Sequence, residues 1–348
     1  MMSQISAGSR IWARAAGNLI DGEPDTMKPF DWKRKFDAPF TVIDSHDGFD
    51  RYHIVNETGD GTITACTVFS GIQAVKLDFR LHRCDNLLRM DKNVIEIAYC
   101  LDGRFESTVN KRLFHFVSAG DLSLACSGKK ESHGAFPTGQ YQGINYFLEP
   151  EPFVRNHAAL LHDLEISLER IQTLASFTPR CFVLHHNHAL DAIQKAIADG
   201  FSTQSVPWLK IKTMELLLFL SSLRDEEAND SPAYLNKNNV ALAKAAHKLL
   251  TANPARHTTI EQLAAGLGAG TTSLKTSFKS VYGIPIYQYR KELRLQRAQQ
   301  LLRETSLPVA AIATETGYTN PAKFSSAFRN RFGLPPTEYR KQNGAGKK

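Results

Sequence analysis

The sequence predicts a chain of two unlike domains: a β-barrel or jelly roll followed by amphipathic helices, and then an all-α domain with two helix-turn-helix units joined by a long helix. Short segments rich in β-branched and aromatic residues fill the first half of the chain. Helical spacing of apolar residues follows, and a helix-turn-helix pattern occurs twice near the C-terminus. A length of 348 residues suits two domains at roughly 150 residues each.

The composition excludes several classes of protein. A content of 42% hydrophobic and 22% charged residues is typical of globular chains and not of disordered ones. No run of about 18 apolar residues predicts a membrane-spanning helix, and residues 1–20 lack the features of a secretory signal, so we expect a cytoplasmic protein. The five cysteines are widely spaced, which predicts reduced thiols and neither disulfides nor a zinc ribbon.

The first half of the chain predicts strands. Residues 1–55 contain scattered Gly, Pro and Asp and predict an irregular segment, whereas residues 56–150 predict the barrel. Asp102-Gly103 lies between two apolar stretches and is a strong hairpin signal. The predicted strands are 62–69, 74–81, 94–101, 104–109, 113–117, 121–126 and 143–148.

Beyond Pro150 the apolar residues recur every three or four positions, as in amphipathic helices. Residues 151–224 predict a helical segment that either covers the barrel or mediates dimerisation, and the polar residues 225–239 predict a linker. The last domain then spans 240–342. The predicted helices are 152–162, 164–175, 189–198 and 207–223, followed by 240–250, 260–267, 271–282, 286–303, 309–316 and 321–332.

An internal repeat occupies the last domain. Residues 260–264 (IEQLA) match 309–313 (VAAIA) at an offset of 49, and residues 274–285 match 324–335 at an offset of 50. Each unit has the order helix, short turn, helix. Thr258 and Glu261 form a capping-box pattern, and Asn320 is an N-cap candidate before a Pro. Two predicted helices end with a Gly just past the last turn, at Gly283 and Gly333.

The charge is divided unevenly between the two halves. The whole chain carries +7, but residues 240–348 hold 17 Lys and Arg against 5 Asp and Glu, which is +12 and leaves −5 for the rest. A strongly basic domain beside an acidic body predicts a polyanionic partner for one end of the chain only. The alternative from charge alone is a solvated basic surface.

The stretch from Thr258 to Arg340 closely resembles the DNA-binding domain of AraC/XylS-type transcription regulators. The resemblance runs through IEQLAAGLG, LKTSFKSVYGIPIYQYRKELRLQRAQQLL and VAAIATETGYTNPAKFSSAFRNRFGLPPTEYR. It implies two helix-turn-helix units that read consecutive major-groove faces of double-stranded DNA. The family's usual mode implies an activator that recruits RNA polymerase and forms a homodimer.

The two second helices of the repeat supply the candidate DNA-binding residues. Leu274 and Phe278 should point inward in one unit, and Phe324 and Phe328 in the other. The opposite faces then carry Thr271, Thr272, Lys275, Thr276 and Lys279, and Ala322, Lys323, Ser325, Ser326, Arg329 and Asn330. The resemblance implies base contacts from Thr272, Lys275 and Thr276, and from Pro321, Ala322, Lys323 and Ser326. A solvated surface is the alternative for each of them.

The segment 286–303 joins the two units. As a helix of 18 residues it spans roughly 27 Å, which could set two recognition helices about one DNA turn, roughly 34 Å, apart. The residues expected in the core are Leu293, Ala298, Leu301 and Leu302. Those expected to be available to phosphates are Arg290, Lys291, Arg294 and Arg297, with Lys323, Arg329 and Arg331 in the second unit.

The N-terminal half resembles the cupin-like sensor domains of the same family less specifically, through IEIAYCLDGR, a Gly-Asp turn and FPTGQYQGI. This resemblance implies a pocket for a small-molecule effector; sugars, aromatic acids, ferri-siderophores and fatty acids serve within the family. Control by a partner protein is the alternative. Candidate lining residues, for which core packing is the competing role, are Tyr99, Arg104, Phe114, Tyr141 and Tyr146.

Signals for catalysis and cofactors are missing from the sequence. No Ser/His/Asp signature, P-loop or GxGxxG is present, so we expect neither an enzyme nor a cofactor. His185-His186-x-His188 is the one dense histidine cluster, and a solvated turn is the favoured interpretation over a metal site. A cupin enzyme with a DNA-binding appendage is the rival, which stoichiometric metal in the purified protein would revive.

Substituting Lys275 tests base readout in the first unit. Lys275→Ala should cost about 1–3 kcal/mol at the cognate site and relax the preference there, because the lysine can donate to guanine O6 or N7. Arg290→Ala should instead weaken binding to all sequences and flatten the salt dependence. Binding constants on cognate and scrambled duplexes distinguish the two, and an equal loss on every sequence for Lys275→Ala would make it a phosphate contact only.

Overall fold

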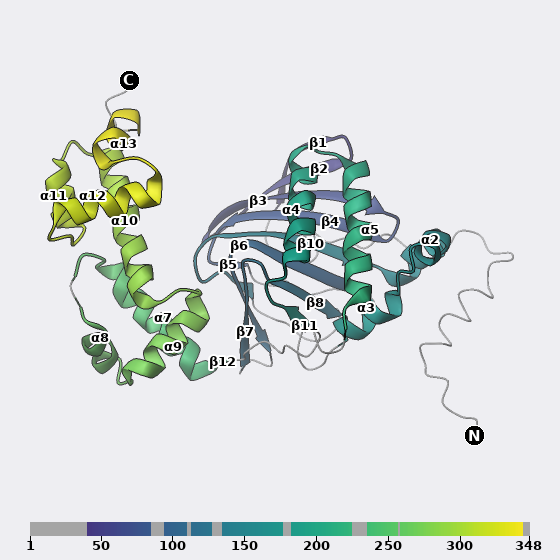
Figure 1. Ribbon diagram of the computed structural model, residues 1–348, viewed down its shortest axis with the longest axis horizontal. Helices are drawn as coiled ribbons and strands as arrows, with labels where there is room; N and C mark the ends of the chain where they lie inside the picture. The colour runs from purple at the N-terminus through teal and green to yellow at the C-terminus, as the bar shows by residue number, and fades with distance from the viewer. Residues whose placement is uncertain are drawn as a thin grey trace. The chain divides into compact units, whose positions relative to one another are not determined.

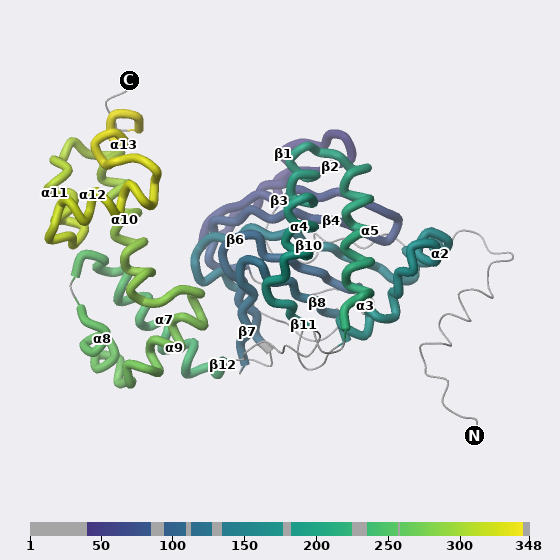
Figure 2. The backbone as a smooth tube through the Cα atoms, viewed as in Figure 1, coloured from purple at the N-terminus to yellow at the C-terminus, as the bar shows by residue number. Residues whose placement is uncertain are grey.

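The computed structural model describes residues 40–84, 94–109, 113–126, 134–176, 182–224, 235–256 and 258–343. The chain divides into two compact units between residues 234 and 235. The first unit is a curved antiparallel sheet with helices packed on one face, and the second is almost entirely helical (Figures 1 and 2). The fold class therefore agrees with the one that the sequence predicts, and the four described cysteines are free thiols.

The sheet of the first unit follows the order β1-β2-β3-β4-β10-β6-β7, with β8 pairing with β6 and β11, and β9 with β5 and β6. All these pairs are antiparallel. The strands are β1 (Phe40–His46), β2 (Phe49–Asn56), β3 (Gly59–Phe69), β4 (Ile72–Arg80), β5 (Arg83–Cys84), β6 (Ile95–Val109), β7 (Leu113–Ser118), β8 (Leu122–Cys126), β9 (Gly134–Ala135), β10 (Tyr141–Leu148) and β11 (Phe182–Leu184).

The hairpin of β1 and β2 corrects the prediction that residues 1–55 are irregular. Asp47 and Gly48 join the two strands with φ angles of 52° and 82°, the left-handed pair that a two-residue hairpin turn requires. No residue of strand β1 is fully buried, and its sequence FTVIDSH does not alternate between apolar and polar residues. The period-two pattern that indicates a strand is therefore missing. Residues 1–39 lie outside the described part of the chain.

Gly103 lies within a strand and not in a hairpin turn, so the hairpin prediction at Asp102-Gly103 was wrong. Strand β6 runs unbroken through this dipeptide, and its register against β10 shifts at Leu101, just before the dipeptide, as in a β-bulge. The φ of Gly103 is 81°, and a Cβ at this residue would lie 2.1 Å from the carbonyl oxygen of Gln140. A left-handed glycine occurs both beside strand irregularities and in tight turns, so the dipeptide alone does not separate them.

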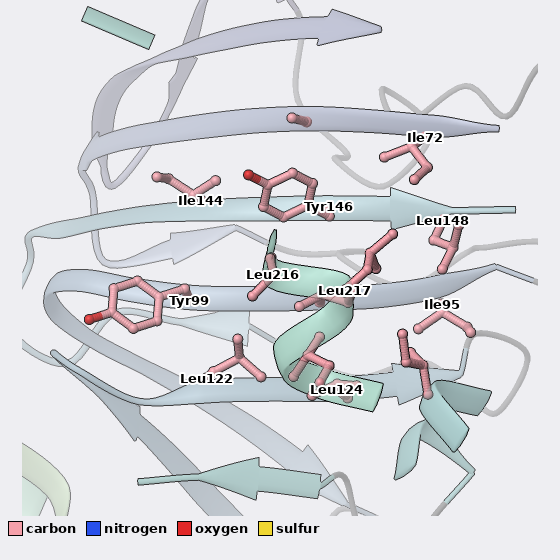
Figure 3. Close-up of a cluster of buried hydrophobic side chains, with 14 of the residues drawn as sticks. Ile72, Ile95, Tyr99, Leu122, Leu124, Ile144, Tyr146, Leu148, Leu216 and Leu217 are labelled. Atoms are coloured by element: carbon pink, nitrogen blue, oxygen red, sulfur yellow. The ribbon is translucent and has the colours of Figure 1, made fainter. Parts of the chain in front are cut away.

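The two faces of the sheet form separate cores. On one face the side chains of β6, β8 and β10 pack under helix α5, where Leu216 and Leu217 lie over Tyr146 and Leu124 (Figure 3). On the other face an aromatic group fills the concave side, with ring centroids 4.9 Å apart for Phe136 and Tyr141. The helices of this unit are α2 (Pro150–Asp163), α3 (Leu168–Ala175), α4 (His188–Ser202) and α5 (Val206–Ser222).

The second unit contains β12 (Leu235–Asn236), α7 (Lys237–Ala252), α8 (Ile260–Gly266), α9 (Thr271–Tyr282), α10 (Ile286–Glu304), α11 (Val309–Glu315), α12 (Pro321–Phe332) and α13 (Pro336–Asn343). Helix α7 begins earlier than predicted, because the side chain of Asn236 caps it by accepting from the backbone N–H of Asn239 at 2.9 Å. Residues 225–234 of the expected linker lie outside the described residues.

The helices of the described residues were compared with the requirements for crossing a membrane. None of the helices there combines the length and the apolar character that crossing a bilayer requires.

Comparison of Gly103→Ala with Gly48→Ala tests the bulge. Both residues have left-handed φ angles, but a Cβ at Gly48 would find its nearest neighbour 3.5 Å away, whereas one at Gly103 meets backbone at 2.1 Å. We expect Gly48→Ala to lower the free energy of unfolding by about 1 kcal/mol and Gly103→Ala by about 3 kcal/mol or more. Tryptophan fluorescence during urea unfolding reports on this unit, because all three tryptophans precede residue 234. Equal losses would contradict the bulge geometry.

Candidate nucleic-acid interface

The helix pairs α8–α9 and α11–α12 have the same internal packing. In the first pair Leu263 and Ala264 are buried beneath Leu274 and Phe278 of the following helix. In the second pair the corresponding buried residues are Ile312, Ala313, Phe324 and Phe328. The small alanines allow close approach of the second helix, so the repeat in the sequence is also a repeat in structure.

Caps fix where each of these helices starts and ends. The capping box of α8 uses Thr259 and Gln262, one residue later than the predicted Thr258 and Glu261, with the two side-chain-to-backbone bonds at 3.2 and 3.0 Å. The side chain of Asn320 accepts from the N–H groups of Ala322 and Lys323, as predicted. Helices α9 and α12 both end at left-handed glycines, Gly283 with φ 80° and Gly333 with φ 79°.

The predicted contact faces of α9 and α12 are on the surface. Thr272, Lys275, Thr276 and Lys279 are exposed on α9, and Thr271 is half-buried. On α12 the residues Pro321, Ala322, Lys323, Ser326 and Arg329 are all exposed. The exposed face of α9 is polar and cationic, whereas that of α12 combines Pro321 and Ala322 with polar and cationic residues. In both helices the buried aromatic and aliphatic residues occupy the opposite side.

Arg294 and Arg290 of α10 are bound to backbone and differ from the sequence-based expectation of side chains available to phosphates. Arg294 donates from Nε to the carbonyl of Pro254 at 2.9 Å, and from its two terminal nitrogens to Gly317 and Ala255 at 3.2 and 3.3 Å. Arg290 donates to the carbonyl of Thr258 at 2.6 Å. Partial burial lowers the pKa of both guanidinium groups. Both side chains nevertheless keep their positive charge, because arginine is not deprotonated in proteins.

Gly317 makes the Arg294 contact possible. Its φ is 84°, and a Cβ there would lie 2.8 Å from the carbonyl oxygen of Ala255 and 2.9 Å from Cζ of Arg294. A side chain at this position would therefore push the turn between α11 and α12 away from the segment that precedes α8. The sequence indicated a turn glycine here but not its close approach to an arginine.

Other contacts complete the support of α10. Leu295 is in the core with Ala298, Leu301 and Leu302, whereas the predicted Leu293 is only half-buried. Arg331 forms a salt bridge with Glu292 at 2.8 Å, so this arginine too is engaged within the unit. Arg297 lies 3.7 Å from Glu315, and Lys291 remains exposed.

Helix α7 contributes an aromatic contact that the sequence reasoning missed. The ring of His247 stacks on Tyr282 with centroids 4.7 Å apart, and its Nε2 lies 2.7 Å from the hydroxyl of Tyr289. This single side chain joins the end of α9 to the start of α10. Its signal was available in the helical spacing of Val240, Ala243 and Ala246, which places α7 against the core.

The predicted effector-pocket residues do not converge. Tyr99 and Tyr146 lie on the helix-covered face of the sheet, whereas Tyr141 lies in the aromatic group on the concave face. Arg104 stacks on Phe116, with its Cζ 5.3 Å from the ring centroid, and donates to Ser118. Phe114 is half-buried on β7. Tyr141 and Tyr146 are five residues apart on β10 and therefore lie on opposite faces. The bulge at Leu101 changes the face onto which the β6 side chains beyond it point, among them Arg104.

The two helix pairs share their buried contacts, and the second helix of each pair ends at a left-handed glycine and has an exposed face. This arrangement is that of a repeated helix-turn-helix motif. Residues 263–342 match a family model described as a helix-turn-helix domain. The second unit of the chain therefore contains a helix-turn-helix domain, and it is similar to the corresponding part of AraC-like transcription regulators.

Similar proteins share this domain. The transcriptional activator RhaR of Mannheimia succiniciproducens is 46% identical over 69 residues, which are 20% of this chain and 25% of the relative. An AraC-like transcription regulator of Streptomyces antibioticus is 34% identical over 89 residues, or 26% of this chain and 29% of the relative. The chain thus spans less than a third of the length of either relative.

A solved transcriptional regulator from Chromobacterium violaceum, described as containing an AraC-type DNA-binding domain, is 32% identical. The match covers 32% of this chain and 99% of that one, with a TM-score of 0.29.

Comparison of Gly317→Ala with Gly266→Ala tests the Arg294 contact. Gly317→Ala should lower the local stability of α10–α12 by about 1–3 kcal/mol, because it combines a left-handed φ with a backbone clash. Gly266 is helical and has nothing within 4 Å of a built Cβ, so Gly266→Ala should stabilise by about 0.4–1 kcal/mol. Amide hydrogen exchange measures both changes, in residues 286–332 for Gly317→Ala and in residues 260–282 for Gly266→Ala. Unaltered exchange in Gly317→Ala would show that the contact is dispensable.

Proposed function

We propose that the chain is a transcription regulator that binds double-stranded DNA in a sequence-specific manner. The observation that carries this proposal is the pair of exposed, polar helices α9 and α12, each held by the same buried contacts and joined through α10. Helix α10 has 19 residues and so spans about 28 Å, which approaches one turn of DNA. The excess positive charge of this unit supports attraction to phosphates.

We propose that the two units contribute differently. Lys275 can donate to a guanine, and Thr272 can contact a thymine methyl, so α9 carries the stronger base readout. Pro321 and Ala322 have no side-chain donors, so α12 acts more through Lys323 and Arg329 on phosphates. Arg290 and Arg294 are positioning residues in this proposal, since their guanidinium groups already serve backbone carbonyls.

The N-terminal unit is proposed to control DNA binding as a cupin-like domain that takes a small-molecule effector in the cytoplasm. An effector shifts the equilibrium between the two functional states of the regulator only by as much as its affinities for the two states differ. Homodimerisation is proposed through α5, whose inner side is buried on the sheet while Trp208, Ile211 and Leu218 are 44%, 62% and 42% exposed. Activation through RNA polymerase is proposed because a relative of the same domain is named an activator.

DNA selection followed by footprinting tests the proposal. Duplexes selected from a random pool by the full chain should show two protected major-groove segments about one helical turn, roughly 34–36 Å, apart. Lys275→Ala should relax the sequence preference within one segment only. Lys323→Ala should weaken binding to all duplexes and reduce the salt slope by about one ion.

Lys195→Ala is the matched control. It removes one exposed lysine from α4 in the N-terminal unit and should leave binding unchanged. Failure to select any consensus, or equal effects of all three lysine substitutions, would contradict sequence-specific readout by α9 and α12.

A further inference from the structure

Metal-type ligands gather at the start of α4, in the N-terminal unit. His186 and His188 lie on either side of the N-cap residue, and Asp191 follows one turn later. One ligand atom from each, a ring nitrogen or a carboxylate oxygen, lies within 4.8 Å of the others. Imidazole nitrogens and carboxylate oxygens are ligands that Zn²⁺ accepts. We propose that these three side chains bind a divalent transition-metal ion of the zinc type, with water in the remaining coordination position.

The backbone that carries the two histidines is held on both sides. The side chain of Asn187 accepts from the N–H groups of Ala189 and Leu190 at 3.0 and 3.2 Å, which fixes the first turn of α4. On the other side Nδ1 of His185 lies 2.9 Å from a carboxylate oxygen of Asp121. The peptide between these contacts is the one that presents the imidazole of His186.

Gly120 provides room for that imidazole. This residue forms the turn before β8 with φ 88°, and a Cβ there would lie 2.9 Å from Nδ1 of His186. The ring therefore rests against bare backbone, with the same nitrogen 3.4 Å from Oδ2 of Asp191. Although the His186 side chain is 69% exposed, its ring is directed toward the carboxylate and not away from it.

The carboxylate of Asp191 is oriented by a buried tyrosine. Tyr99 on β6 is 6% exposed, and its hydroxyl donates to Oδ1 of Asp191 at 2.9 Å. Oδ2 is left facing the histidines. Metal-binding carboxylates are commonly held by such an outer hydrogen bond, which fixes the oxygen that binds the ion.

Geometry and charge both permit the ion. Ligand atoms of a tetrahedral zinc lie about 3.3 Å apart for bonds of about 2.0 Å, so the cluster must close by an ångström or so. Rotation of two exposed imidazoles supplies that movement without displacing backbone. The N-terminus of α4 presents about half a positive charge, which opposes a cation, but the full negative charge of Asp191 exceeds it.

The structure thereby changes the interpretation of His185-His186-x-His188. The sequence favoured a solvated turn because the histidines fall at a predicted helix start that follows the strands. Asp191 lies outside that motif, and Tyr99, which binds Asp191, is 92 residues from Asp191 in the sequence. A solvated turn would not need a buried hydroxyl to orient a carboxylate toward two imidazoles.

Competition for Zn²⁺ against a chromophoric chelator tests the site in the full, untagged chain. The wild type should bind one Zn²⁺ at this site. His188→Ala and Asp191→Asn should weaken its affinity at least about tenfold, and Tyr99→Phe, which keeps the ring packing, by about tenfold. His162→Ala is the matched control, because it removes a histidine that is 91% exposed on α2 and far from the cluster in sequence.

Two outcomes would overturn the proposal. One is a wild type that takes no Zn²⁺ from the chelator. The other is a His186→Ala/His188→Ala double variant that retains wild-type affinity, which would assign the ion to other groups such as the exposed thiol of Cys126. Circular dichroism of each variant, matched to the wild type, confirms that a loss of affinity reflects lost ligands and not unfolding.

Discussion

The hydrogen bonds of Arg294 hold the helix-turn-helix domain together as one body. This half-buried side chain lies in the middle of α10 and donates to carbonyls that precede the first helix pair and to one in the turn of the second. A buried carbonyl left without a donor costs about 1–3 kcal/mol, so one guanidinium with its fixed fork of donors satisfies several costly groups at once. A lysine has a single nitrogen and could not bridge both pairs.

Local signals predicted the second unit well. The helix boundaries depend on residues close together in the sequence, such as the N-cap at Asn320 and the helix-ending glycines Gly283 and Gly333. Together with the repeat, these local signals were enough to predict the helices. The role of Arg294 was not predictable, because its acceptors lie 23 to 40 residues away and the sequence shows charge without showing acceptors. The exposed positions Thr272 and Lys275 could be predicted because Leu274 and Phe278 fix the buried side of α9.

The first unit was harder to predict because its structure depends on pairing between distant strands. The strands themselves were mostly predicted, but Asp102-Gly103 suggested a turn where β6 continues through a bulge. The bulge at Leu101 reverses the face of the β6 side chains beyond it, so alternation along the sequence could not place Arg104 relative to Tyr99. Tyr99 lies before the bulge and contacts α4, where its hydroxyl donates to Asp191, a partner 92 residues away that local patterns do not reveal.

The stiffness of α10 has a consequence for the DNA that such a domain can occupy. Because one continuous helix of 19 residues joins the two pairs, and Arg294 braces it on both sides, the protein has little freedom to change their separation. On the proposed function, a joint that cannot stretch leaves any adjustment of spacing to the double helix, so base steps between the two contacted segments would contribute to recognition through their stiffness and without being touched.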